Sequence, residues 1–212
     1  MTPLVNHIIA RDDALPPIQP GLLYEYVFAA NGVFARGQRD GLEALIPVAR
    51  FKNANTLRGL AAVEPSVRLL YPRVPAYLLD ALVARARQAR DEQGNPVEIL
   101  FYLTFNAEAR RWQLVAPPQE QGHARVIPLD RHSLDAARAL IHAHSHHDFA
   151  PVFSRDDDRD HTGFQLYAVL GNLSSRPTLR VRVGLYGYRM DIPAWTVFEE
   201  LSEVTDAQAD DA

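Results

Sequence analysis

The sequence lacks cysteine altogether: none occurs among its 212 residues. This absence excludes disulfide bonds, thiolate zinc sites and cysteine nucleophiles together. It is compatible with a reducing compartment, so we expect a cytoplasmic protein.

A strong excess of charge of either sign is also missing. The formal net charge is −4, and the 22 lysine and arginine residues are spread along the chain, so we expect no nucleic-acid partner. No apolar run approaches the length needed to cross a bilayer. Residues 1–7 lack a basic segment followed by an apolar core, so we expect neither a secretory signal nor a membrane partner.

The composition changes along the chain predict a β-rich extension over residues 1–70. Residues 1–20 hold four prolines and read as an arm or edge segment. Strand formers at 22–28 and 33–36 flank Asn31-Gly32, which predicts a hairpin with a type I′ turn. Residues 42–48 are expected to add a third strand.

A second domain is expected over residues 71–195. Apolar residues at helical spacing predict a helix over 75–92, closed by Gly94. The apolar run 97–105 predicts a central strand, and further strands are expected at 111–115, 124–129, 164–171 and 179–188, with a helix at 133–140. The last strand alternates, so Arg180 and Arg182 are expected on a solvated face. Residues 196–212 form an acidic tail, whose part from 199 on is expected to be frayed.

Chemistry is concentrated in residues 139–161, which carry five of the eight histidines and five aspartates. Imidazole and carboxylate groups together favour a transition-metal site. On a strand, His144 and His146 would point the same way and could hold one ion. His142 has the same parity, so a three-histidine site stays open.

The spacing in this stretch is H-S-H-x7-S-x-x-D, formed by His144, His146, Ser154 and Asp157. It resembles the signature of the JAMM (JAB1/MPN/Mov34) metalloproteases at every defined position. That family also has an upstream glutamate, for which Glu98 is the candidate.

Further details resemble one branch of that family. The run of histidines, the acidic run and the upstream Asn-Gly-Val-Phe are similar to the protein A family of bacterial PRTRC cassettes. His147 stands where the JAMM family commonly has proline, which puts the shape of that loop in doubt.

The resemblance implies a role for each residue. His144, His146 and Asp157 would bind Zn²⁺ and leave one position for water. Glu98 would take the proton of that water, and Ser154 would stabilise the oxyanion.

Several residues have competing readings. Glu25 and Glu43 are weaker alternatives to Glu98. Asp158 or Asp160 could orient a histidine ligand. A register shift of one residue would exchange Asp157 with a neighbour.

The expected fold is therefore α/β, a JAMM/MPN-type curved mixed sheet flanked by helices, with the β-rich extension at its N-terminus. The expected activity is zinc-dependent isopeptidase or peptidase cleavage after the C-terminus of a ubiquitin-like protein, with an E1/ThiF-like protein as a possible cassette partner. A non-catalytic MPN scaffold and a metallohydrolase of small amides are the alternatives.

Overall fold

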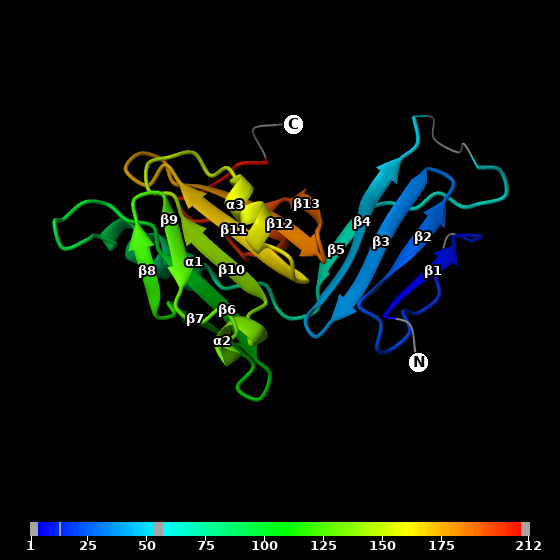
Figure 1. Ribbon diagram of the computed structural model, residues 1–212, viewed down its shortest axis with the longest axis horizontal. Helices are drawn as coiled ribbons and strands as arrows, with labels where there is room; N and C mark the ends of the chain where they lie inside the picture. Colours follow the sequence, from blue (N-terminus) through cyan, green and yellow to red (C-terminus); the bar gives the residue numbers. More distant parts are fainter. Residues whose placement is uncertain (1–3, 13, 53–56, 209–212) are drawn as a thin grey trace.

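The computed structural model describes residues 4–12, 14–52 and 57–208, and these form two β-sheets and a separate hairpin (Figure 1). The N-terminal sheet has its strands in chain order. They are β1 (Val5–Ile9), β2 (Tyr24–Ala29), β3 (Gly32–Arg39), β4 (Leu42–Arg50) and β5 (Ser66–Leu69).

The second sheet has the strand order β13-β12-β11-β10-β6-β7, with β14 beside β12. Strand β10 runs parallel to β11 and antiparallel to β6, so the sheet is mixed as expected. Its strands are β6 (Leu100–Asn106), β7 (Arg111–Val115), β10 (Ile141–Ser145), β11 (Gln165–Gly171), β12 (Thr178–Leu185), β13 (Tyr188–Ile192) and β14 (Thr205–Asp206). The separate hairpin pairs β8 (Gln119–Gly122) with β9 (Arg125–Pro128).

The expected α/β class, with a JAMM/MPN-type sheet flanked by helices, is wrong: the described part of the chain is predominantly β. One helix has substantial length, α1 (Ala76–Gln88), as expected from its apolar stripe. Helices α2 (Leu134–Arg138) and α3 (Arg155–Asp160) span five and six residues, and a 3₁₀ turn covers Ala194–Thr196. Helix α3 buries none of its residues. A short helix without an apolar stripe cannot form a packed layer on a sheet, which is why the sequence does not build flanking helical layers.

One face of the second sheet carries the main core. Alternate residues of its strands, among them Phe101 and Ile141, pack with the apolar stripe of α1. Leu42 and Ile46 of the N-terminal sheet belong to the same cluster. Gly37 lies where an added Cβ would sit 2.6 Å from Leu185, so the two sheets approach closely there. Helix α1 and the N-terminal sheet thus share one face.

The intervening residues of the same strands point to the opposite face, where polar side chains lie beside a small apolar cluster of Leu100, Tyr102, Ala136 and Ala139. This face presents His142 and His144 from β10, Tyr167 from β11 and Arg182 from β12. Helices α2 and α3 lie on this face, and α3 crosses in front of β11 and β12 (Figure 1). The alternation of side chains along the strands therefore places the main core on one face of the sheet and the histidines of the motif on the other.

Two expectations for the N-terminal sheet have different outcomes. The hairpin of β2 and β3 is confirmed, but the type I′ turn at Asn31-Gly32 is wrong, since β3 already begins at Gly32 and Asn31 has no positive φ. The Asn31 side chain instead bonds both backbone groups of Val63, at 2.8 and 3.1 Å. The arm at 1–20 contributes β1, an edge strand that pairs in parallel with β2.

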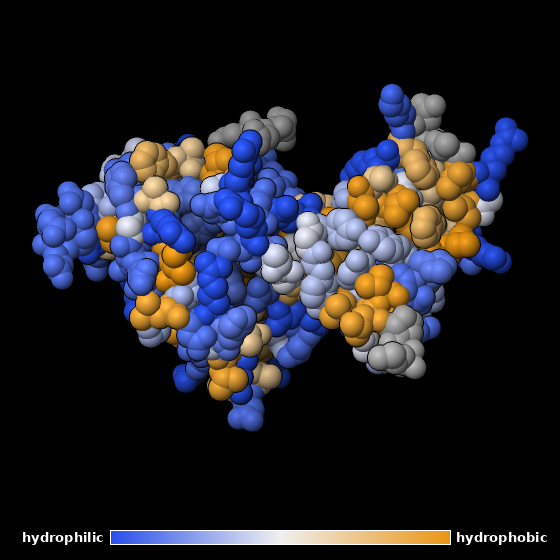
Figure 2. Space-filling view, viewed as in Figure 1, coloured by the Kyte–Doolittle hydropathy of each residue, from blue (hydrophilic) through white to orange (hydrophobic). Residues whose placement is uncertain are grey.

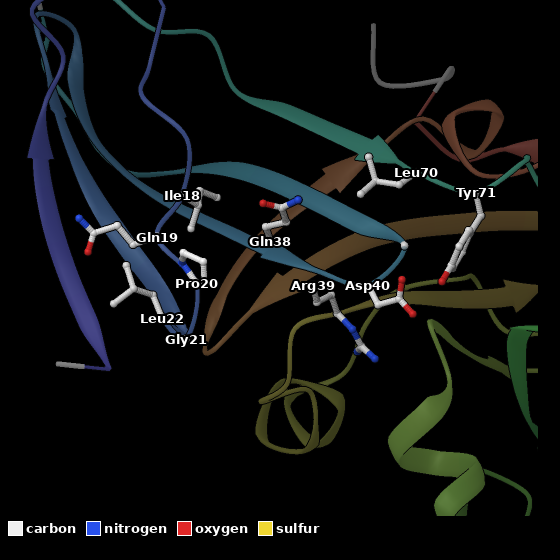
Figure 3. Close-up of a pocket in the computed structure, with 11 residues that line it drawn as sticks. Ile18, Gln19, Pro20, Gly21, Leu22, Gln38, Arg39, Asp40, Leu70 and Tyr71 are labelled. Atoms are coloured by element: carbon white, nitrogen blue, oxygen red, sulfur yellow. The ribbon is translucent and has the colours of Figure 1, made fainter. Parts of the chain in front are cut away.

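The N-terminal lobe, which is built on this sheet, has an apolar surface and a hollow. Apolar side chains gather on the N-terminal lobe, whereas the face around α3 is mostly hydrophilic (Figure 2). Ile9, Phe28 and Val48 are among its exposed apolar residues. A hollow of about 420 Å³ lies where the β3–β4 turn meets Tyr71 (Figure 3), and no residue of the metal motif lines it.

The expectation that the acidic tail is frayed from residue 199 on is also wrong over residues 199–208. Val204 is buried, and Thr205 pairs with Thr178 in the sheet. Residues 209–212, the rest of that acidic tail, lie outside the described residues. None of the helices described is long and apolar enough to span a membrane.

Candidate metal centre

The two histidines of the H-S-H sequence meet at the end of β10. Their Nε2 atoms lie 3.0 Å apart. The Nδ1 atom of His146 lies 3.2 Å from the carbonyl of Ala150, to which it donates, so Nε2 keeps its lone pair. Burial lowers the pKa of His144 to about 4, so its imidazole is neutral at physiological pH. Both rings can therefore offer a nitrogen lone pair to the same point.

Asp157 comes to this point from the first turn of α3. Its Oδ1 lies 3.3 Å from Nε2 of His144. Its Oδ2 accepts hydrogen bonds from the backbone N–H and the hydroxyl of Ser154, at 2.6 and 2.7 Å. The Asp157 N–H in turn donates to the Ser154 hydroxyl at 3.1 Å, which completes a capping box. The helix cap thus fixes one carboxylate oxygen and leaves the other facing the histidines.

Glu98 approaches from the segment that precedes β6. Its Oε1 lies 3.9 Å from Nε2 of His146, and the residue is buried. Ser145, the central residue of H-S-H, holds this segment in place: its backbone and its hydroxyl bond the carbonyl and the N–H of Ile99, at 3.1 and 3.2 Å. The β8–β9 hairpin adds a bond from Glu98 N–H to the carbonyl of Gly122 at 2.8 Å.

The environment of Glu98 disfavours its charged form. Burial and the nearby Asp157 carboxylate raise the pKa of Glu98 to about 8. A cation between the histidines and the two carboxylates would oppose this shift, because it stabilises both negative charges. A buried Glu98 carboxyl group beside the Asp157 carboxylate and two imidazoles is therefore an arrangement that a metal ion would complete.

The two distances from His144 suit a tetrahedral ion. Ligand atoms about 2.0–2.1 Å from a tetrahedral metal lie about 3.3–3.4 Å from one another. The separations of 3.0 and 3.3 Å from His144 to His146 and Asp157 are close to that edge length. Among the described residues, His144, Asp157 and His161 form the group whose ligand atoms all lie within 4.8 Å of one another; this group, which leaves out His146, is largely buried and could hold a metal ion.

His161 was not among the expected ligands. It is the C-cap residue of α3, four residues after Asp157, and its Nδ1 lies 2.7 Å from the guanidinium of Arg182. The i, i+4 spacing from Asp157 is a signal that sequence reasoning could have used. Arg182 carries no such signal, and the expectation that it is solvated was wrong: its side chain is 6% exposed.

The remaining candidates point elsewhere. The Nε2 atom of His142 lies 3.1 Å from the amide nitrogen of Gln165 and 3.4 Å from the carbonyl oxygen of Ala136, and burial lowers the pKa of His142 to about 4. Asp160 pairs with Arg131 at 2.7 Å, and Asp158 pairs with Arg182 at 2.7 Å, so neither bonds a candidate histidine ligand directly.

His147 turns the chain after His146. It adopts a φ of 50°, lies 3.2 Å from the Ala89 carbonyl and is buried rather than solvent-facing. The backbone is therefore left-handed at His147, the position at which the JAMM family commonly has proline.

Neither Glu25 nor Glu43 belongs to the centre. Glu25 is buried in an ion pair with Arg36, and Glu43 pairs with Arg68 on the N-terminal sheet. The structure thus brings Glu98 to the motif, while the catalytic roles of Glu98 and Ser154 stay predictions.

Comparison with known proteins adds no family: no protein-family model matches the chain, and no curated protein is similar to it. The functional argument therefore depends on the motif and on its geometry.

Proposed function

We propose that the chain is a zinc-dependent amide hydrolase, a peptidase or isopeptidase of the JAMM type in its motif, that cleaves after the C-terminus of a ubiquitin-like protein. The observation that carries the proposal is the meeting of three separate segments at one point. His144 and His146, Asp157 and Glu98 come together there across the distances given above. The motif spacing supplies the substrate class, by resemblance.

Zinc fits the donor set. Two neutral imidazoles and one carboxylate are a ligand set typical of catalytic zinc, which keeps a fourth position open. Such an ion supplies a Lewis acid that polarises the scissile carbonyl and acidifies water. The sequence has no cysteine, so a closed thiolate site is excluded.

The residues of the chain would divide the remaining work. Glu98 accepts a proton from the attacking water and passes it to the leaving nitrogen as the C–N bond breaks, which yields a carboxylate and an amine. The base must be ionised, and Glu98 would be ionised more readily beside a bound cation. Ser145 keeps Glu98 in register with the histidines through Ile99.

Ser154 has a more restricted position than the resemblance implies. Its hydroxyl hydrogen is directed to Asp157 Oδ2. To act as an oxyanion donor it would exchange this bond for one to the substrate, while its backbone N–H continues to hold Asp157.

The proposal is tested by cleavage of a panel of ubiquitin-like domains, each extended at its C-terminus by a short peptide. We expect the zinc-loaded protein to release the peptide from at least one of them, and a chelator or Glu98→Gln to reduce the rate by at least about 100-fold. Glu43→Gln is the matched control and should leave the rate unchanged. Unaltered cleavage by Glu98→Gln would refute the mechanism.

The same panel separates the alternatives. A scaffold would bind a ubiquitin-like domain, carry no stoichiometric zinc and cleave nothing. A small-amide hydrolase would cleave short acyl-peptide amides but none of the extended domains. Cassette partners, including an E1/ThiF-like protein, belong to this proposal through the resemblance alone.

A further inference from the structure

Arg182 is a buried cation on the sheet face that carries the metal centre. Its Nη1 donates to Asp158 at 2.7 Å, and its Nη2 lies 2.7 Å from Nδ1 of His161. Its guanidinium carbon sits 3.8 Å from the centroid of the Phe153 ring. Within the described residues its Nε has no hydrogen-bond partner. Burying a guanidinium is costly unless its charge and donors are used, so its position calls for a role.

The contact between Arg182 and His161 fixes a tautomer. A guanidinium has donors only, so Nδ1 of His161 must be the acceptor. A nitrogen that accepts a hydrogen bond carries no proton, so the ring is neutral in this contact. A neutral imidazole that accepts at Nδ1 carries its hydrogen on Nε2.

The ring of His161 is also fixed in place. It stacks on Tyr167, with centroids 3.7 Å apart and planes inclined by 14°. Its edge faces Phe153 at 5.7 Å between centroids. The ring cannot readily turn to exchange its two nitrogens without losing this stack.

A metal ligand must offer a lone pair, and this tautomer leaves His161 none. Its Nδ1 lone pair faces Arg182 and its Nε2 bears a proton, although a ring nitrogen lies within 4.8 Å of the ligand atoms of His144 and Asp157. Without the guanidinium, His161 would be a third imidazole beside the ion. An ion with four protein ligands is typical of closed structural sites, whereas a catalytic ion keeps one position open.

We propose that Arg182 is a positioning residue that keeps His161 out of the coordination sphere and thereby holds one position on the ion open. Asp158, which also pairs with Arg189, holds the guanidinium in place from the far side. The inference rests on the proposed function only in assuming that an ion binds at His144 and Asp157.

The first test is nitrogen NMR of the metal-free wild-type protein. We expect His161 to show an acceptor-type Nδ1 and a protonated Nε2 at pH 7. A protonated Nδ1, or a charged ring, would overturn the inference. This measurement needs neither metal nor turnover.

The second test counts histidine ligands by X-ray absorption of the zinc-loaded protein. We expect two imidazoles in the wild type and three in Arg182→Met. His161→Phe, which keeps an aromatic ring against Tyr167, should retain one zinc per chain with two imidazoles, and so should the double variant. Arg180→Met is the matched control on the same face of β12 and should also show two.

The third test measures whether a position is open. In the cobalt-substituted protein, azide should change the visible absorption of the wild type and of Arg180→Met, and this change should be lost in Arg182→Met. Loss of zinc from His161→Phe, or an unchanged imidazole count and azide response in folded Arg182→Met, would overturn the inference. Failure to cleave any ubiquitin-like fusion would leave these readouts intact and would count against the proposed activity alone.

Discussion

The hydroxyl of Ser154 donates to Oδ2 of Asp157 across 2.7 Å, while Oδ1 of the same carboxylate faces His144. One side chain is thus both a helix cap partner and a candidate metal ligand. The cap orients the ligand, in the way that hydrogen-bonded neighbours orient metal-binding carboxylates elsewhere.

This relationship predicts the effect of Ser154→Ala. The variant loses the cap and one bond to Asp157, so we expect zinc affinity to fall by about 10-fold and the free energy of unfolding to fall by about 1 kcal/mol. Zinc competition titration and chemical denaturation measure the two effects. Ser154→Thr keeps a hydroxyl and should resemble the wild type; a Ser154→Ala protein with unchanged zinc affinity would show that the cap does not position the ligand.

The raised pKa of Glu98 predicts how stability depends on pH in the metal-free protein. Between pH 4.5 and 8 the folded state holds a proton on Glu98 that the unfolded state has released, so stability falls as pH rises. His144 acts in the opposite direction, but only below its ordinary pKa of 6.5.

The window from pH 6.5 to 8 therefore isolates Glu98. There we expect the unfolding free energy to decrease by up to about 2 kcal/mol, measured by denaturation with a chelator present. The decrease should be absent from Glu98→Gln and smaller in the zinc-loaded protein. A wild type and a Glu98→Gln variant with parallel pH profiles would contradict the assignment.

The ligand set predicts a difference between two histidines of the same strand parity. His146→Ala removes a candidate ligand, so we expect less than one zinc per chain at micromolar free zinc. His142→Ala removes a ring bonded to Gln165 and packed on Tyr102, and should keep one zinc per chain. Metal analysis after dialysis decides between them, and the reverse result would favour a site centred on His142.

Gly171 gives a prediction that concerns the loop after the histidines. A Cβ added there would lie 2.2 Å from the Phe149 carbonyl oxygen and 2.8 Å from Pro151 N. Gly171→Ala must displace this loop, whose Ala150 carbonyl receives the Nδ1–H of His146. We expect zinc affinity to fall by about 10-fold, while Gly122→Ala, where an added Cβ would have only a 3.4 Å contact, is the control.

The sequence predicted individual elements well where a local pattern determines them. The stripe of α1 and the strand formers of β2, β3, β6 and β7 depend on periodicity and local residue type, which act over short distances. The motif spacing likewise indicated that Ser154 would lie next to Asp157, because the two residues belong to one helical turn.

The fold class could not be obtained in the same way. The resemblance implied helices on the sheet, but a helix needs an apolar stripe to cover a sheet, and the residues of α3 have none. The N-terminal sheet covers part of the core that helices were expected to cover, since Leu42 and Ile46 belong to one core cluster with residues far along the chain. Pairings of this kind leave no local signature in the sequence.

Arg182 illustrates the same limit within the site. Its alternation with apolar residues is the ordinary pattern of a strand with one wet face. Here the supposedly wet side lies under Asp158 and Phe153, which arrive from a loop and helix 24 or more residues earlier. The burial of a strand face depends on what covers it, and the strand itself does not encode that.

The common core of the two sheets has a mechanical consequence. Because Leu42 and Ile46 belong to the same core cluster as residues of β12, we expect the N-terminal lobe to stay fixed against the second sheet, and calorimetry should record a single cooperative transition for the whole chain. A protein bound to that lobe would keep a constant distance from His144. The length of the bound protein's C-terminal tail, rather than a closing movement of the lobe, would then determine which bond reaches the candidate site.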